Sequence, residues 1–89
     1  IFSDWRRLTE NEVRMAKQVF ADSIDFHHIK IYRGIPLIPN ANTAIAPNGN
    51  IYFPRKHCPD DFTQAGIAYK IWLIHELTHV WQHQRGHKV

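Results

Sequence analysis

Five consecutive residues near the end of the chain, His75-Glu76-Leu77-Thr78-His79, form an H-E-x-x-H motif. On a helix, residues four apart lie on one face, one turn from each other. Two imidazoles placed in this way can bind one Zn²⁺ at about 2.0–2.1 Å each. Glu76 can then accept a proton from a water that the metal has made more acidic. The motif therefore predicts a zinc metallopeptidase site, with His75 and His79 as metal ligands and Glu76 as the catalytic base.

The motif needs a helix with an apolar side, and its flanks predict one over about residues 67–85. Apolar residues recur there at helical spacing, and they are Ile67, Ala68, Ile71, Trp72, Ile74, Leu77, Val80 and Trp81. Asp60 and Asp61 are candidate N-terminal caps, Gly66 weakens the first turn, and Gly86 is a candidate stop. Because the chain has 7 histidines, a chance motif is less rare than usual, but this helical context argues against chance.

A second helix is predicted near the start of the chain. Thr9 and Glu12 are spaced as a capping box, which opens a helix that runs to about Ala21. Its expected inward stripe consists of Val13, Ala16, Val19 and Phe20. The charged residues of this segment lie mostly off that stripe, as in a helix that packs on one side only.

The middle of the chain has the patterns of strands. Residues 29–33 alternate and are β-branched, so they predict a strand. A hairpin is predicted over residues 44–53 with Asn48 and Gly49 at its tip, because both residues tolerate positive φ. The order helix, strand, hairpin, motif helix predicts an α+β, zincin-like fold with an N-terminal helix, a small twisted sheet with a β-hairpin, and a long C-terminal motif helix. One hairpin strand is expected to pair with an extended substrate.

Composition limits the classes of protein that the chain can represent. Its 89 residues suit one small domain, and 44% hydrophobic with 12% aromatic residues indicates a globular protein. No apolar run approaches 18 residues, so no membrane span is expected. The net charge of +3 comes from scattered basic residues, and nucleic acid is not an expected partner. Cys58 is the single cysteine, so the fold does not need a disulfide.

A catalytic zinc usually has three protein ligands and a water, and the motif supplies two of the three. His83 lies eight positions after His75, about 12 Å along a helix axis, which is too far for one ion. His87 follows Gly86 directly and has no chain length to turn back. Loop residues are further candidates, namely His27, His28, His57, Asp60 and Asp61. The simplest expectation is a third ligand beyond Val89.

Four segments together resemble a known family. They are residues 8–20, residues 22–25, the run APNGNIYFP at residues 46–54, and the run IHELTHVWQ at residues 74–82. In this order they resemble the zinc metallopeptidase domains at the ends of bacterial VgrG spike proteins and Rhs-type polymorphic toxins. The resemblance covers nearly the whole chain, and the two quoted runs together are far more specific than the motif alone.

The resemblance implies a gluzincin-like enzyme, in which a Glu from a later helix would complete the Zn²⁺ site. Residues 1–89 would then be a single but incomplete zincin-like domain. It also implies an antibacterial effector that is secreted by a contractile (type VI) system and cleaves a peptide or protein in the periplasm or cell wall of a rival cell. An immunity protein would be a further partner. Tyr52 and His57 are our candidates for substrate contact. The alternative is a truncated, non-catalytic zincin-like module that binds a partner protein.

Overall fold

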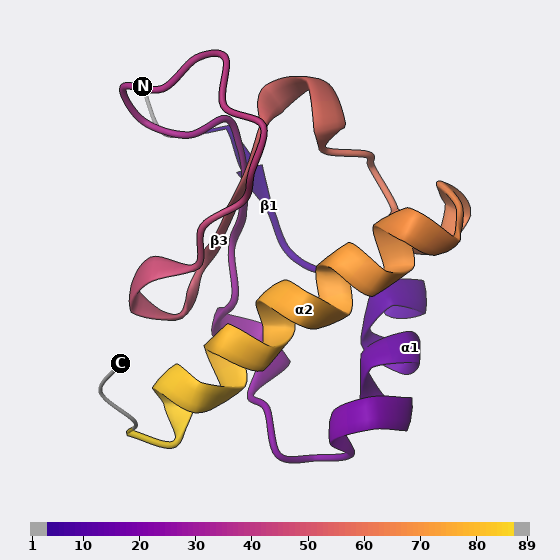
Figure 1. Cartoon of the computed structure of the whole chain (residues 1–89). Coiled ribbons are helices and arrows are strands. Elements are labelled where there is room, and N and C mark those ends of the chain that lie inside the picture. Colours follow the sequence, from indigo (N-terminus) through magenta and orange to yellow (C-terminus); the bar gives the residue numbers. More distant parts are fainter. Residues whose placement is uncertain (1–3, 87–89) are drawn as a thin grey trace.

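The motif helix, α2, spans Ile67–Gln84 and packs against a small sheet in a computed structural model that describes residues 4–86 (Figure 1). The other regular elements are β1 (Trp5–Arg6), α1 (Glu10–Phe20), β2 (Ile31–Arg33) and β3 (Ile51–Phe53). Short 3₁₀ turns connect them. The chain is therefore an α+β domain, as predicted, and its zincin-like character stays a prediction. No helix within residues 4–86 is long and apolar enough to span a membrane.

Helix α1 begins with the predicted capping box. The Thr9 hydroxyl accepts a hydrogen bond from the Glu12 backbone N–H, and the Glu12 carboxylate accepts one from the Thr9 backbone N–H. The predicted inward stripe is correct for Ala16, which is fully buried, but wrong for Val19, which is exposed. Glu12 takes a buried position instead, because Arg6 compensates its charge there.

The three strands form one sheet in the order β1-β2-β3, in which β1 is antiparallel to β2 and β2 is parallel to β3. The predicted hairpin over residues 44–53 is reduced to one antiparallel bridge, between Ile45 and Tyr52. The chain does reverse at Asn48 and Gly49, both of which have positive φ. A regular hairpin does not form because the next hydrogen-bonded pairs on either side of Ile45 and Tyr52 would include Pro47 and Pro54, and proline has no backbone N–H to donate.

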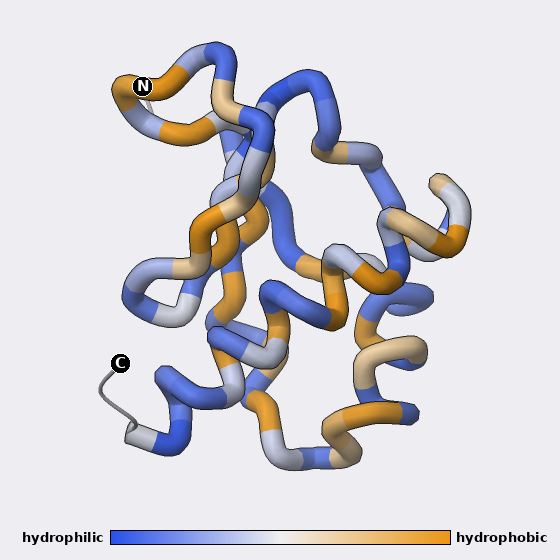
Figure 2. Tube along the Cα trace, in the orientation of Figure 1, coloured by the Kyte–Doolittle hydropathy of each residue, from blue (hydrophilic) through white to orange (hydrophobic). Residues whose placement is uncertain are grey.

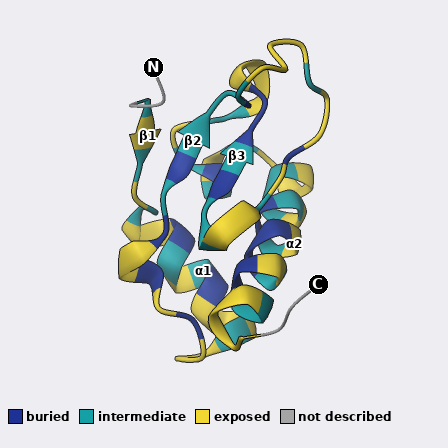
Figure 3. Ribbon diagram, turned by 90° about the vertical axis from the view of Figure 1, so that its left-hand side faces the viewer, coloured by how far each residue is buried: buried dark blue, intermediate teal, exposed yellow. Residues whose placement is uncertain are grey.

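The core lies between the sheet and the two helices, and Figure 3 shows its buried residues on β2, β3, α1 and α2. Its fully buried apolar side chains are Ala16, Ile29, Ile31, Ile51, Phe53, Phe62, Leu73, Leu77 and Val80. The Trp72 and Phe53 rings pack nearly perpendicular to each other at a centroid distance of 5.0 Å, and this contact joins α2 to β3. On the opposite face of the sheet, Tyr32 and Tyr52 stack at 4.3 Å.

Helix α2 begins at Ile67, as predicted, but its cap and its buried face differ from the prediction. Asp61 caps the 3₁₀ turn at residues 62–64, and α2 itself begins after Gly66, whose φ is +105°. Apolar and polar residues are interspersed along α2 (Figure 2). The residues that it buries are Leu73, Glu76, Leu77 and Val80, whereas Ile67 and Ile71 are 70% and 63% exposed. The sequence pattern predicted these two as core residues. That prediction is wrong because the face of α2 that packs toward the sheet is centred on Leu73.

Candidate metal-binding site

The H-E-x-x-H residues face a cavity of about 440 Å³ between α2 and the chain segment before the turn at Asn48. The lining residues are Thr43, Ala44, Ile45, Ala46, His75, Glu76, His79, Gln82 and His83. The wall opposite α2 is the stretch that bridges to β3 through Ile45. Tertiary packing therefore sets the motif opposite a piece of extended backbone.

The two motif histidines lie next to each other on α2, as their spacing predicts. Their ring centroids are 5.1 Å apart and the rings are inclined by 82°. The His75 side chain is 65% exposed, so its ring nitrogens are accessible from the cavity. Neighbouring, accessible imidazoles of this kind are suitable ligands for one divalent ion.

Glu76 differs from both histidines because its side chain turns inward and is only 7% exposed. Its Oε2 lies 3.9 Å from His75 Nε2, and no residue within 4–86 donates a hydrogen bond to this carboxylate. Burial raises the pKa of Glu76 above its ordinary value, and the nearby His75 and His79 oppose this rise. A buried carboxylate without a donor, beside two imidazoles, suits a cation and an attacking water. The chemistry of His75, His79 and Glu76 is thus compatible with a Zn²⁺ ion, and the two imidazoles supply two of the usual three protein ligands.

A third ligand is not assembled within the part of the chain that the structure describes. Residues 4–86 contain no group of three His, Cys, Asp or Glu side chains placed to hold a metal ion. Several of the loop candidates have other partners. Asp60 is bonded to Arg33 and Asp61 caps the turn at residues 62–64. His87 lies outside the described residues.

The two residues proposed for substrate contact do not line this cavity. Tyr52 points to the opposite face of the sheet, where it stacks on Tyr32. His57 Nδ1 lies 3.1 Å from Tyr69 Oη, and His57 is not among the residues that line the motif cavity. Their substrate role stays a prediction, and these positions do not favour it.

Two further polar residues of α2 line the cavity. Sequence reasoning missed Gln82, and it considered His83 only as a third metal ligand, which it rejected. Gln82 Oε1 lies 3.3 Å from His79 Nδ1. The His83 ring sits against Gly49, where an added Cβ would lie 2.9 Å from His83 Cδ2. Their spacing of three and four residues from His79 places them on its side of the helix, and that spacing was the available signal.

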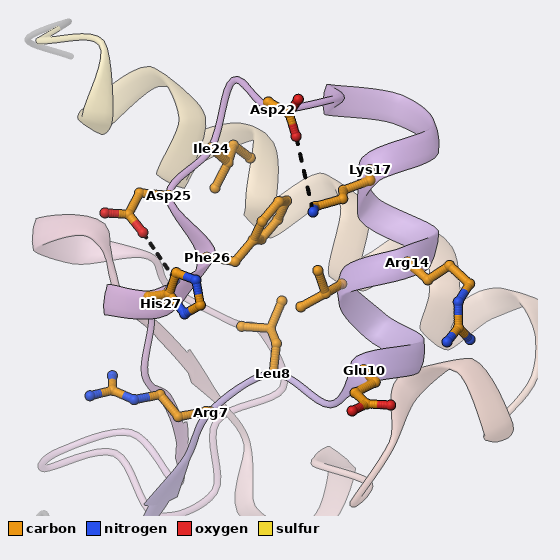
Figure 4. Close-up of a pocket in the computed structure, with 11 residues that line it drawn as sticks. Arg7, Leu8, Glu10, Arg14, Lys17, Asp22, Ile24, Asp25, Phe26 and His27 are labelled. Atoms are coloured by element: carbon orange, nitrogen blue, oxygen red, sulfur yellow. Dashed lines mark hydrogen bonds and ion pairs between the residues drawn. The ribbon is translucent and has the colours of Figure 1, made fainter.

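A second cavity, of about 630 Å³, lies between α1 and the segment that follows it (Figure 4). Leu8 and Phe26 contribute apolar surface, and charged residues stand around them. Lys17 and Asp22 approach each other to 4.0 Å, and Asp25 accepts the backbone N–H of His27. Asp22 and Asp25 thus have partners of their own, and nothing in this cavity matches the exposed imidazole pair beside a buried carboxylate on α2.

The fold and the site define a small α+β domain with a candidate metal-binding helix. Comparison with known proteins identifies a relative of this chain. The chain is 39% identical over 84 residues to the type VI secretion system spike protein VgrG2b of Pseudomonas aeruginosa. The aligned region covers 91% of this chain and 8% of VgrG2b. It matches the solved structure of the effector domain of Pseudomonas aeruginosa VgrG2b with a TM-score of 0.82 and 38% identity. That match covers 91% of this chain and 46% of the solved chain. No family model matches the chain.

The chain is therefore a homologue of a VgrG effector domain and shares its fold over the matched part. This confirms the VgrG part of the resemblance inferred from the sequence. The chain spans less than half of the solved effector domain and a small part of the whole spike protein.

Proposed function

We propose that this chain is the metal-binding part of a zinc-dependent peptidase that acts as a type VI effector domain. The observation that carries the proposal is the buried carboxylate of Glu76, which lines the cavity beside two accessible imidazoles and has no hydrogen-bond donor among residues 4–86. Similarity to a VgrG effector domain supports the delivery route.

In this proposal His75 and His79 hold the Zn²⁺. When bound, zinc supplies a Lewis acid that polarises the scissile carbonyl and makes an attacking water acidic. Glu76 accepts the proton of that water and then gives it to the leaving amine. Burial raises the pKa of Glu76 above its ordinary value, which makes it a stronger base than an exposed glutamate.

The segment opposite α2 suits a peptide substrate. Ile45 exchanges both backbone hydrogen bonds with Tyr52. The backbone groups of its neighbours Ala44 and Ala46 therefore point away from β3, because bonding directions alternate along an extended chain. Both neighbours line the cavity. An extended peptide that adds to this edge would lie beside the motif.

The proposed place of action is the periplasm of a target cell, with a cell-wall peptide or a periplasmic protein as substrate. Delivery by the contractile secretion system brings an effector into that compartment or through it. A producing cell would need an immunity protein, and the open motif face is where such a protein would block the site.

Metal analysis tests the first part of this proposal. Zinc is measured in the purified chain and in its His75→Ala and His79→Ala variants, with His27→Ala as a control because His27 is exposed and does not line the cavity. We expect both motif variants to lose zinc and the control to keep it. Because two protein ligands are fewer than the usual three or four, we expect weak binding by this chain alone. Equal zinc in all variants would refute the assignment.

Glu76→Gln tests the catalytic part in the longer parent protein. The amide cannot accept the proton, so hydrolysis or toxicity should be lost while zinc stays bound. The alternative, a non-catalytic module that binds a partner through its motif face, is favoured by the incomplete ligand set within residues 4–86. It predicts that Glu76→Gln leaves toxicity near normal, which would end the peptidase proposal.

A further inference from the structure

A second side chain in the cavity contacts His79, and this contact bears on the orientation of the His79 ring. His79 Nδ1 lies 3.3 Å from Gln82 Oε1, one helical turn further along α2. The side-chain oxygen of glutamine has only lone pairs to offer. With the amide in this orientation, the contact is a hydrogen bond only when Nδ1 carries the proton, and the lone pair of the neutral ring is then on Nε2.

We propose that Gln82 is a positioning residue that holds His79 in its Nδ1–H form and so presents Nε2 to the metal. This role rests on the proposed zinc site. A free histidine side chain prefers the other tautomer, with the proton on Nε2, which would block that nitrogen as a ligand. Partners that fix the ring and tautomer of a metal-binding histidine typically change metal affinity by about 10–100-fold.

The surroundings of Gln82 hold it in place for this contact. Gln82 is partly buried and lines the same cavity as His79. Two residues later, Gln84 accepts the Asp25 backbone N–H at 2.7 Å and donates to the Asp25 carbonyl at 3.0 Å. These two bonds tie the last turn of α2 to the loop after α1. The backbone at Gln82 is thus restrained, although its amide is near solvent.

His75 provides an internal comparison. Its Nε2 faces the Glu76 carboxylate at 3.9 Å, and no amide within residues 4–86 forms a hydrogen bond with its ring. A change at Gln82 should therefore affect the tautomer of His79 and leave that of His75 unchanged. A general loosening of the helix would affect both rings.

The test is made on this chain with three variants. Gln82→Leu removes the acceptor, Gln82→Glu restores one, and Gln18→Leu is the control, since Gln18 is an exposed residue of α1 away from the cavity. Long-range ¹H–¹⁵N spectra of the metal-free proteins report which ring nitrogen carries the proton, at about pH 8.5, where free histidine is neutral. Titration with zinc chloride, followed by NMR, reports affinity even when binding is weak.

We expect His79 to be mainly Nδ1–H in the unmodified chain and in the Gln18 and Gln82→Glu variants. In Gln82→Leu, the Nε2–H form should dominate and zinc should bind about tenfold more weakly. An Nε2–H form in the unmodified chain, or unchanged affinity in Gln82→Leu, would overturn the role of Gln82. Absence of any zinc response at His75 and His79 would overturn the metal site itself, and the tautomer spectra would still show separately whether Gln82 holds the ring.

Discussion

Replacing Glu12 with alanine should be among the most destabilising single changes in this small domain. The Glu12 side chain is fully buried and accepts two hydrogen bonds from Arg6, at 2.8 and 2.9 Å. It also accepts the backbone N–H of Thr9 at 2.9 Å and that of Phe62 at 2.8 Å. One carboxylate therefore joins β1, α1 and the segment that leads into the motif helix.

The magnitude follows from what the substitution leaves behind. The Arg6 side chain is only 14% exposed, so its charge would remain largely buried without a counterion. Removing one partner of a buried ion pair typically costs about 3–5 kcal/mol. The Phe62 N–H would lose a buried acceptor, for which about 1–3 kcal/mol is typical. These costs overlap, and we expect a total loss of about 4 kcal/mol, against a typical domain stability of about 5–15 kcal/mol.

Urea unfolding followed by circular dichroism measures this loss. Glu10→Ala is the matched control, because Glu10 is exposed in the same helical turn and should cost no more than about 1 kcal/mol. A loss below about 1.5 kcal/mol for Glu12→Ala would refute the reasoning. If that variant does not fold, the double variant Arg6→Met with Glu12→Leu should recover the part of the stability that comes from the buried charge, because an apolar pair leaves no charge buried; the loss of the acceptor for the Phe62 N–H remains.

Three further outcomes follow from the structure. Two guanidinium groups hold the pKa of Asp4 below its ordinary value of 3.8, so Asp4→Asn should lower stability at neutral pH, and urea unfolding should show that this difference disappears as the pH falls below the folded-state pKa. Burial raises the pKa of the Cys58 thiol, so iodoacetamide should alkylate Cys58 more slowly than free cysteine at neutral pH, with the rate rising only at more alkaline pH. An alkylation rate equal to that of free cysteine would contradict this burial. Leu73→Ala should lower the free energy of unfolding by about 2–5 kcal/mol because Leu73 is fully buried, whereas Ile71→Ala should change it by less than about 1 kcal/mol. Equal losses for the two variants in urea unfolding would contradict the assigned orientation of α2.

Local signals in the sequence were sufficient where the physics is local. The capping box needs only Thr9 and Glu12 three residues apart, and the structure contains it. The shared face of His75 and His79 follows from the helical repeat, and their rings are adjacent. Gly66 was expected to disturb the start of the motif helix, and the helix begins directly after it. Each of these outcomes depends on groups less than two turns apart.

Tertiary structure decided what depends on partners far away in the chain. The sequence shows the turn at Asn48 and Gly49, but only the fold pairs β3 with β2 in parallel and leaves a single antiparallel bridge to Ile45. The sequence shows Glu12 as a capping residue, but only packing against β1 makes it a buried ion-pair partner. Likewise, the helical repeat placed the motif on one face of α2, whereas the packing of α2 on the sheet determined that Glu76 is buried and the histidines face the cavity. Helical spacing is a property of a few neighbouring residues, while burial and strand pairing are settled by contacts that exist only once the whole domain has folded.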